Sequence, residues 1–167
     1  MEKILVSACL LGANVRYHGG AATSSHPVLQ RWAIEDRLIR VCPEMDGGLS
    51  APRPAAEIVG QDGGRGVHAQ LAVVKTVDGA DVTQSFLAGA EIALKIAKQH
   101  HIRIAILKDG SPSCGSAFTY DGSFSSRKRP DVGVTTAWLE ANGVRVFSEN
   151  QIDEAAALID EWERVGS

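Results

Sequence analysis

The sequence contains little of what membrane, secreted or nucleic-acid-binding proteins use. It has no apolar run of about 18 residues, and its start, MEKILVSA, lacks the charged region, long apolar region and cleavage site of a signal peptide. We therefore expect a cytoplasmic protein without a membrane segment. The net charge of -3 gives no attraction to a nucleic-acid backbone, and the single basic run, SSRKRP, is interpreted as a solvated loop. No GxGxxG or Walker A motif is present, so phosphate binding has no motif support.

Cysteine is also scarce. The chain has 3 cysteines in 167 residues, which is too few, and an odd number, for a disulfide framework. No CxxC pair is present, which excludes a zinc ribbon and a thioredoxin-type motif. In a reducing compartment the remaining interpretations are buried thiols, a metal site or a nucleophile.

The rest of the composition is typical of a globular protein, with 44% hydrophobic and 22% charged residues. A chain of 167 residues can bury a core without disulfide or metal support, and it shows no internal repeat or low-complexity linker. We therefore predict a single domain over residues 1–167. No apolar stripe is left over once the core is assigned, so the oligomeric state stays open, with a monomer as the working expectation.

Short apolar runs alternate with helical patterns along the chain. Asp81 is expected to cap the clearest helix, and Asn150 to cap the last one. The pattern predicts strands at 3–8, 38–41, 102–107 and 144–147, and helices at 27–37, 81–101, 134–142 and 151–165. The alternation predicts an α/β fold, with helices flanking a mainly parallel sheet in a three-layer domain.

The segment 47–66 is rich in glycine and proline and is interpreted as a long functional loop. It leads into a predicted small hairpin, in which residues 56–61 pair with residues 69–76 across a glycine turn.

The three cysteines follow three of the predicted strands. Cys9 follows the first strand directly, Cys42 follows the second, and Cys114 follows the third after the short loop KDGSPS. The carboxyl ends of parallel strands lie at one edge of a sheet, where ligands bind. Any one of these cysteines alone would be interpreted as a small buried residue, but the three together predict a shared site on one rim.

Three thiolates can hold more than one kind of metal centre. A catalytic zinc accepts three protein ligands and a water molecule. An iron–sulfur cubane normally takes four cysteines, and three would leave one iron open to a substrate atom. The spacing of the cysteines alone leaves both possibilities open.

Few other residues near the cysteines can perform acid–base or binding chemistry. Glu44 lies two residues after Cys42 and is a candidate general acid or base, while Ser111 and Ser113 flank Cys114 within hydrogen-bonding reach of a ligand. His18 is a weaker candidate, from the loop after the first strand. Gly48 would permit close backbone approach to a planar ligand.

Several motifs in this order resemble those of the thiouracil desulfidase family: SACLLG, RYHGG, CPEMDGGL, PRPAAEIVG, DVTQSFLAGA, ILKDGSPSCG, YDGSF and VFSEN. The resemblance covers the chain from Lys3 to about Asn150. It implies an α/β domain and a 4Fe-4S cluster bound by only three cysteines, which would be Cys9, Cys42 and Cys114.

The resemblance also implies roles for Glu44 as the catalytic carboxylate and for Ser111 as a catalytic or substrate-orienting hydroxyl. The expected reaction is a non-redox desulfidation of a small thiolated pyrimidine such as 2-thiouracil or 4-thiouracil. The sulfur of the pyrimidine binds the open iron, and an oxygen atom from water takes the place of that sulfur on the ring. Two alternatives are a non-catalytic iron–sulfur carrier or sensor, and a zinc hydrolase with three cysteine ligands.

Overall fold

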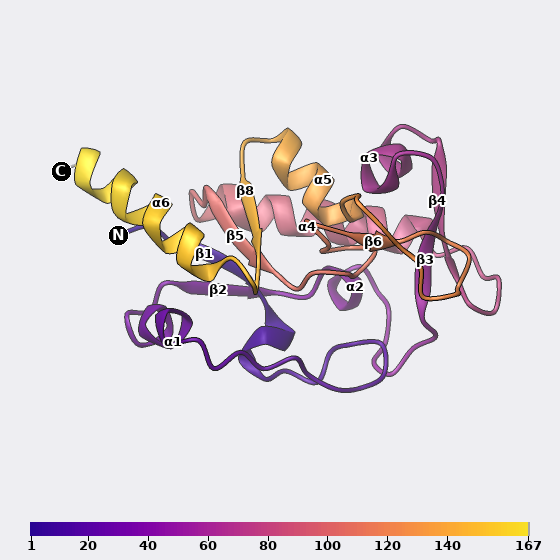
Figure 1. Ribbon diagram of the computed structural model, residues 1–167, viewed down its shortest axis with the longest axis horizontal. Coiled ribbons are helices and arrows are strands. Elements are labelled where there is room, and N and C mark those ends of the chain that lie inside the picture. Colours follow the sequence, from indigo (N-terminus) through magenta and orange to yellow (C-terminus); the bar gives the residue numbers. More distant parts are fainter. Residues whose placement is uncertain (167) are drawn as a thin grey trace.

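The computed structural model describes residues 1–166 (Figure 1). The elements in chain order are β1 (Ile4–Ser7), the 3-10 helix η1 (Ala8–Leu11), α1 (Pro27–Ile34), β2 (Leu38–Val41), α2 (Pro43–Asp46), β3 (Ala56–Gly60), α3 (Gly63–His68), β4 (Ala72–Thr76), α4 (Thr83–Gln99), β5 (Ile104–Leu107), β6 (Thr119–Tyr120), β7 (Lys128–Arg129), α5 (Val134–Ala141), β8 (Arg145–Ser148) and α6 (Ile152–Val165).

The main sheet has the strand order β2-β1-β5-β8, and every neighbouring pair is parallel. All four of its strands were predicted from the sequence, with end points that differ by at most two residues. The predicted fold class, an α/β domain with a mainly parallel sheet flanked by helices and a small hairpin, is therefore confirmed.

Alternate residues of the strands enter two different cores, because successive side chains of a strand point to opposite faces. Ile4 and Ile104 pack with α1 and α6 on one face, whereas Leu5 and Leu107 pack with α4 and α5 on the other. Figure 1 shows the resulting layers, with α1 and α6 on one side of the sheet and α4 and α5 on the other. The sheet is covered on both faces, so ligands can reach it only at its ends.

The helix ends differ in part from the predictions. Asp81 lies one residue before Val82, the N-cap residue of α4, which makes no side-chain cap; its Oδ1 still accepts a hydrogen bond of 2.9 Å from the backbone N–H of Thr83, the first residue of the helix. The predicted cap at Asn150 is wrong: α6 begins after Gln151, which makes no side-chain cap to its own helix. The side chain of Gln151 instead accepts a hydrogen bond from the backbone N–H of Ser148, at the end of β8.

The predicted hairpin forms, but its connection is not a glycine turn. Strands β3 and β4 pair antiparallel, and the short helix α3 lies between them. A Cβ atom at Gly64 would lie 2.1 Å from the carbonyl oxygen of Gly133, so α3 depends on close backbone contact with the segment before α5. The glycine-rich sequence of α3 has a low helix propensity, and the helix forms because of this tertiary contact.

A third core joins this hairpin to helices α4 and α5. Ile58 and Val74 of the hairpin pack with Phe86 of α4 and Val134 of α5. None of the helices formed by residues 1–166 is long and apolar enough to span a membrane. The assignment of residues 1–167 to a single domain stays a prediction.

Candidate functional site

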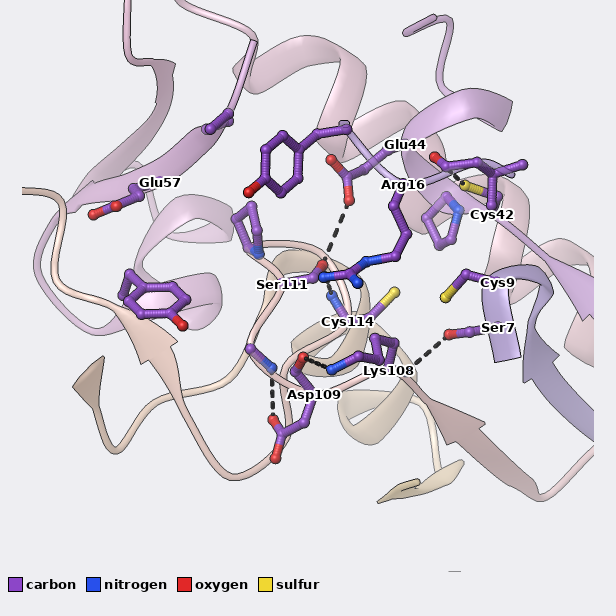
Figure 2. Close-up of a pocket in the computed structure, with 18 of the residues that line it drawn as sticks. Ser7, Cys9, Arg16, Cys42, Glu44, Glu57, Lys108, Asp109, Ser111 and Cys114 are labelled. Carbon is purple, nitrogen blue, oxygen red and sulfur yellow. Dashed lines mark hydrogen bonds between the residues drawn. The ribbon is translucent and has the colours of Figure 1, made fainter. Parts of the chain in front are cut away.

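A cavity of about 460 Å³ lies at the carboxyl ends of β1, β2 and β5 (Figure 2). Its wall includes Cys9, Cys42 and Cys114, so the structure brings the three cysteines together as predicted. The wall also contains four aromatic side chains, a composition typical of sites for small planar ligands: Tyr17, Phe118, Tyr120 and Phe124.

Each cysteine is presented by a short, hydrogen-bonded segment just beyond its strand. Cys9 belongs to η1 and Cys42 directly precedes α2, where its backbone N–H donates to Asp46. Cys114 lies in the loop after β5, and its backbone N–H donates 2.9 Å to the hydroxyl of Ser111. Burial raises the pKa of all three thiols, so binding a metal centre there would release protons.

The three thiols fit a multinuclear centre better than a single ion. Among residues 1–166, no group of three His, Cys, Asp or Glu side chains is arranged to hold one metal ion. The thiols nevertheless line one cavity, and in an iron–sulfur cluster each cysteine binds a different iron, so the ligands need not converge on a point. The soft thiolate donors favour an iron–sulfur cluster or zinc over hard cations, and so do not separate these two centres. This geometry counts against the zinc alternative.

Glu44 faces the same cavity from α2. Its Oε1 lies 3.3 Å from Nε of Arg53, and its Oε2 accepts a hydrogen bond of 3.5 Å from the Ser111 hydroxyl. Burial raises the pKa of Glu44, while the Arg53 and Ser111 hydrogen bonds and the charge of Arg16 oppose this rise. The carboxylate is thus held in place by two partners beside the three thiols.

The position of Glu44 depends on close packing of α2 against α4. A Cβ atom at Gly47 would lie 2.0 Å from the carbonyl oxygen of Ser85, and one at Gly89 would lie 2.0 Å from that of Pro43. Only glycine allows the two backbones to approach in this way. The contact sets the depth of Glu44 in the cavity.

The loop after β5 is organised by two side chains. Oδ1 of Asp109 accepts backbone N–H bonds from Gly110 and Ser116, both of 2.9 Å. The hydroxyl of Ser111 accepts backbone N–H bonds from Ser113 and Cys114. Because its acceptor positions are occupied by these N–H groups, Ser111 has its single proton left for Glu44.

Three predicted substrate contacts are not supported by the structure. Ser113 is 0% exposed and its hydroxyl lies 2.7 Å from that of Thr135, so it does not reach the cavity. His18 is exposed, accepts a hydrogen bond from the backbone of Gly20, and does not line the cavity. Gly48 lines a neighbouring cavity of about 370 Å³ instead.

Sequence reasoning missed the charged residues of the cavity wall. Arg16, Arg53, Lys108, Glu57 and Asp109 all line the cavity. Four of them are single charged residues in loops and Glu57 is a single charged residue of β3, so together they form no periodic or spaced pattern. The one available signal was the position of Lys108 and Asp109 directly after β5, where loop residues of a parallel sheet meet ligands.

The fold and the cavity define an α/β protein with a thiol-lined site suited to a metal cluster. Residues 4–151 match the model of the 2-thiouracil desulfurase family, and the chain belongs to that family. It is 42% identical to the uncharacterized protein YbbK of Bacillus subtilis (strain 168) over 151 residues, which are 90% of this chain and 98% of YbbK.

A solved structure is similar over almost the whole chain. It is described as the [4Fe-4S]-dependent thiouracil desulfidase TudS, and it is 43% identical to this chain. The match has a TM-score of 0.87 and covers 96% of this chain and 99% of TudS. The α/β architecture described above is therefore also that of a solved family member.

Proposed function

We propose that this protein removes sulfur from a thiolated pyrimidine such as 2-thiouracil or 4-thiouracil, giving uracil and hydrogen sulfide. The substrate is a small cytoplasmic molecule and not a nucleic acid. One observation carries the proposal: three thiols and a carboxylate line a single cavity at the edge of the sheet. Membership of the 2-thiouracil desulfurase family and similarity to TudS support it.

In this proposal Cys9, Cys42 and Cys114 hold a 4Fe-4S cluster. When bound by only three cysteines, such a cluster supplies a Lewis-acidic iron without a protein ligand, which can polarise a carbon–sulfur bond. The donor set and the shared cavity suit this cofactor, as argued above. The other residues of the wall then have to bind the pyrimidine and handle protons.

Glu44 is the residue proposed to move the proton. Its carboxylate lies at the cavity wall and can accept a proton from a water molecule that attacks the thiocarbonyl carbon. A carbon–oxygen bond forms, the carbon–sulfur bond breaks, and the two protons of water leave with sulfur as hydrogen sulfide. The reaction has no net oxidation or reduction, so it needs no external electron donor.

Ser111 is proposed to position Glu44. Its hydroxyl donates to Glu44 while it accepts from the backbone N–H of Cys114, so it links the carboxylate to one of the thiols. Arg53 holds the other carboxylate oxygen. With both oxygens held, Glu44 keeps a fixed direction toward the cavity.

The test is anaerobic purification followed by iron and sulfide analysis and incubation with 2-thiouracil and 4-thiouracil. We expect a brown protein that releases uracil and sulfide in excess over the sulfide of its own cluster, and an apoprotein control that releases neither. A colourless protein with one zinc per chain would favour the hydrolase alternative. A brown protein that converts neither compound would favour a carrier or sensor.

A further inference from the structure

Three cationic side chains line the cavity in the described residues 1–166, and two of them are already paired. Arg53 binds Glu44 and also donates to the backbone carbonyls of Val15 and Ser50, at 2.9 and 2.8 Å. Lys108 lies 2.8 Å from a carboxylate oxygen of Glu149 and donates to the backbone of its own loop. These two cations have structural partners and little capacity left for a ligand.

Arg16 is different. Within residues 1–166 no hydrogen bond or ion pair is made by its side chain. The five N–H donors of Arg16, a half-buried residue, therefore lack a hydrogen-bond partner in the protein, although Arg16 lies at the wall of a cavity. A donor group left in this state is suited to a ligand that supplies the acceptor.

The backbone around Arg16 is fixed, so the free side chain is not a sign of a loose loop. The N–H of Arg16 donates 3.1 Å to the carbonyl of Gly20. On either side of Arg16, the carbonyls of Val15 and Tyr17 both accept from Arg53, at 2.9 and 2.6 Å. Figure 2 shows the Arg16 side chain extending into the cavity toward Ser111.

The proposed substrates offer a matching acceptor. 2-Thiouracil and 4-thiouracil each keep one exocyclic oxygen, on a ring carbon that a single ring nitrogen separates from the thiocarbonyl carbon. Electron density rises on that edge of the ring when water attacks the thiocarbonyl carbon. A guanidinium, which is planar, always charged and able to direct N–H donors at one carbonyl oxygen, suits this oxygen better than an ammonium group does.

We propose that Arg16 binds the remaining exocyclic oxygen of the thio-oxo pyrimidine and so selects it over thiopyrimidines without that oxygen. This inference rests on the proposed function, since it assigns the side chain that holds its substrate. The competing view is that Arg16 only offsets the negative charge of the thiolate-bound centre. That role would be independent of the substrate's oxygen and would be served equally well by lysine.

The test compares Arg16→Gln and Arg16→Lys with Arg31→Gln, a control on the exposed face of α1. Each anaerobically purified holoprotein is assayed for sulfide release from 2-thiouracil and from pyrimidine-2-thione, which lacks the exocyclic oxygen. Calorimetry measures the Kd for uracil, a non-reactive probe that carries the oxygen. Iron content and the absorption spectrum report on the cluster independently of turnover.

We expect Arg16→Gln to lower kcat/KM for 2-thiouracil about 10- to 100-fold, with a similar weakening of uracil binding. The value for pyrimidine-2-thione should change less than about threefold, and Arg16→Lys should recover only part of the loss. Iron content and spectrum should match those of wild type and of Arg31→Gln. Equal losses with both thiopyrimidines, full recovery by lysine, or unchanged uracil binding would each overturn the inference.

The same experiment separates this inference from the proposed function. If the wild-type holoprotein converts neither thiopyrimidine, the proposed function fails. The uracil Kd still decides on Arg16 in that case: weaker binding by Arg16→Gln supports the contact, and an equal Kd, or no uracil binding by wild type, refutes it.

Discussion

The two ends of the main sheet each carry a buried or half-buried arginine, and the two are used in opposite ways. At the amino end, Arg37 is 5% exposed and donates through Nε to the carbonyl of Glu2, while its two Nη atoms pair with Glu35 and Glu163. At the carboxyl end, Arg16 has no such partner within residues 1–166. At the amino end Arg37 belongs to a closed ion-pair network, whereas at the carboxyl end Arg16 keeps its donors available beside the paired Arg53 and Lys108.

This difference indicates that the amino end of the sheet contributes to stability and that the carboxyl end is arranged for chemistry. Buried charges are costly unless they are paired, so the amino end satisfies every nitrogen of Arg37. The carboxyl end instead gathers three thiols, whose pKa burial raises, with a carboxylate whose pKa burial also raises. Substitutions at the amino end should therefore lower the free energy of unfolding, whereas substitutions at the carboxyl end should lower the iron content or kcat.

The largest effect is expected at the thiols. Cys114→Ser should reduce iron content to near zero and abolish sulfide release, because a 4Fe-4S cluster held by three cysteines would lose a third of its protein ligands. The apoprotein should stay folded because serine nearly matches the volume of cysteine, although its unfolding temperature should fall because a hydroxyl replaces a thiol in an apolar cluster. Iron analysis and circular dichroism of the apo form check the two parts, and full iron content in the variant would contradict the ligand assignment.

Glu44→Gln should lower kcat about 10²- to 10⁴-fold, the range for loss of a general base or acid. Iron content should stay at the wild-type value, because the carboxylate is not among the proposed ligands. The matched control is Glu91→Gln, on the exposed side of α4, which should behave as wild type. Retention of turnover in Glu44→Gln would remove the proton-transfer role.

Arg37→Met tests the other end of the sheet. Removing one member of a buried ion pair leaves Glu35 and Glu163 without their partner, and the free energy of unfolding should fall by roughly 2–4 kcal/mol. The value is at the lower end for buried pairs because both glutamates are partly exposed. Unfolding in denaturant measures this change in the free energy of unfolding. The kcat per iron-loaded protein should be unchanged, and a large loss of kcat would mean that the two ends are coupled.

Ser111→Ala should have the smallest effect, a loss of about 10-fold in kcat, which corresponds to one hydrogen bond. The hydrogen bond to Glu44 is long, at 3.5 Å, and Arg53 continues to hold the other carboxylate oxygen. Ser25→Ala, an exposed residue before α1, is the control. Iron content is measured as well, because the Ser111 hydroxyl also accepts the backbone N–H of the proposed ligand Cys114. If Ser111→Ala kept its iron and were still as inactive as Glu44→Gln, the hydroxyl would act on the substrate directly and not only through Glu44.

Much of the fold could be predicted because the main-sheet strands and long helices follow strong local patterns. The stripe containing Phe86, Ala90 and Leu94 predicts α4, and each of these side chains is buried in the structure. Helix α3 could not be predicted in this way, since its sequence, GGRGVH, has low helix propensity and depends on contacts with the segment before α5. Local pattern cannot reveal a helix that tertiary packing imposes.

The site was predictable to the extent that topology determines it. Three cysteines after three parallel strands must share one rim, and Cys9, Cys42 and Cys114 line one cavity. The side chains of Ser113 and Arg16 were not predictable, because the direction of a loop side chain depends on distant partners. Thr135 draws the hydroxyl of Ser113 away from the cavity, while Arg53 holds the backbone beside Arg16.

The separation of the cysteines also determines the order in which the protein can mature. Cys9, Cys42 and Cys114 come from distant parts of the chain and meet only when β1 has paired with both β2 and β5. An unfolded or half-synthesised chain offers no local thiol pair that could capture iron. The cellular machinery that delivers the proposed cluster would therefore have to act on a polypeptide whose sheet is already assembled.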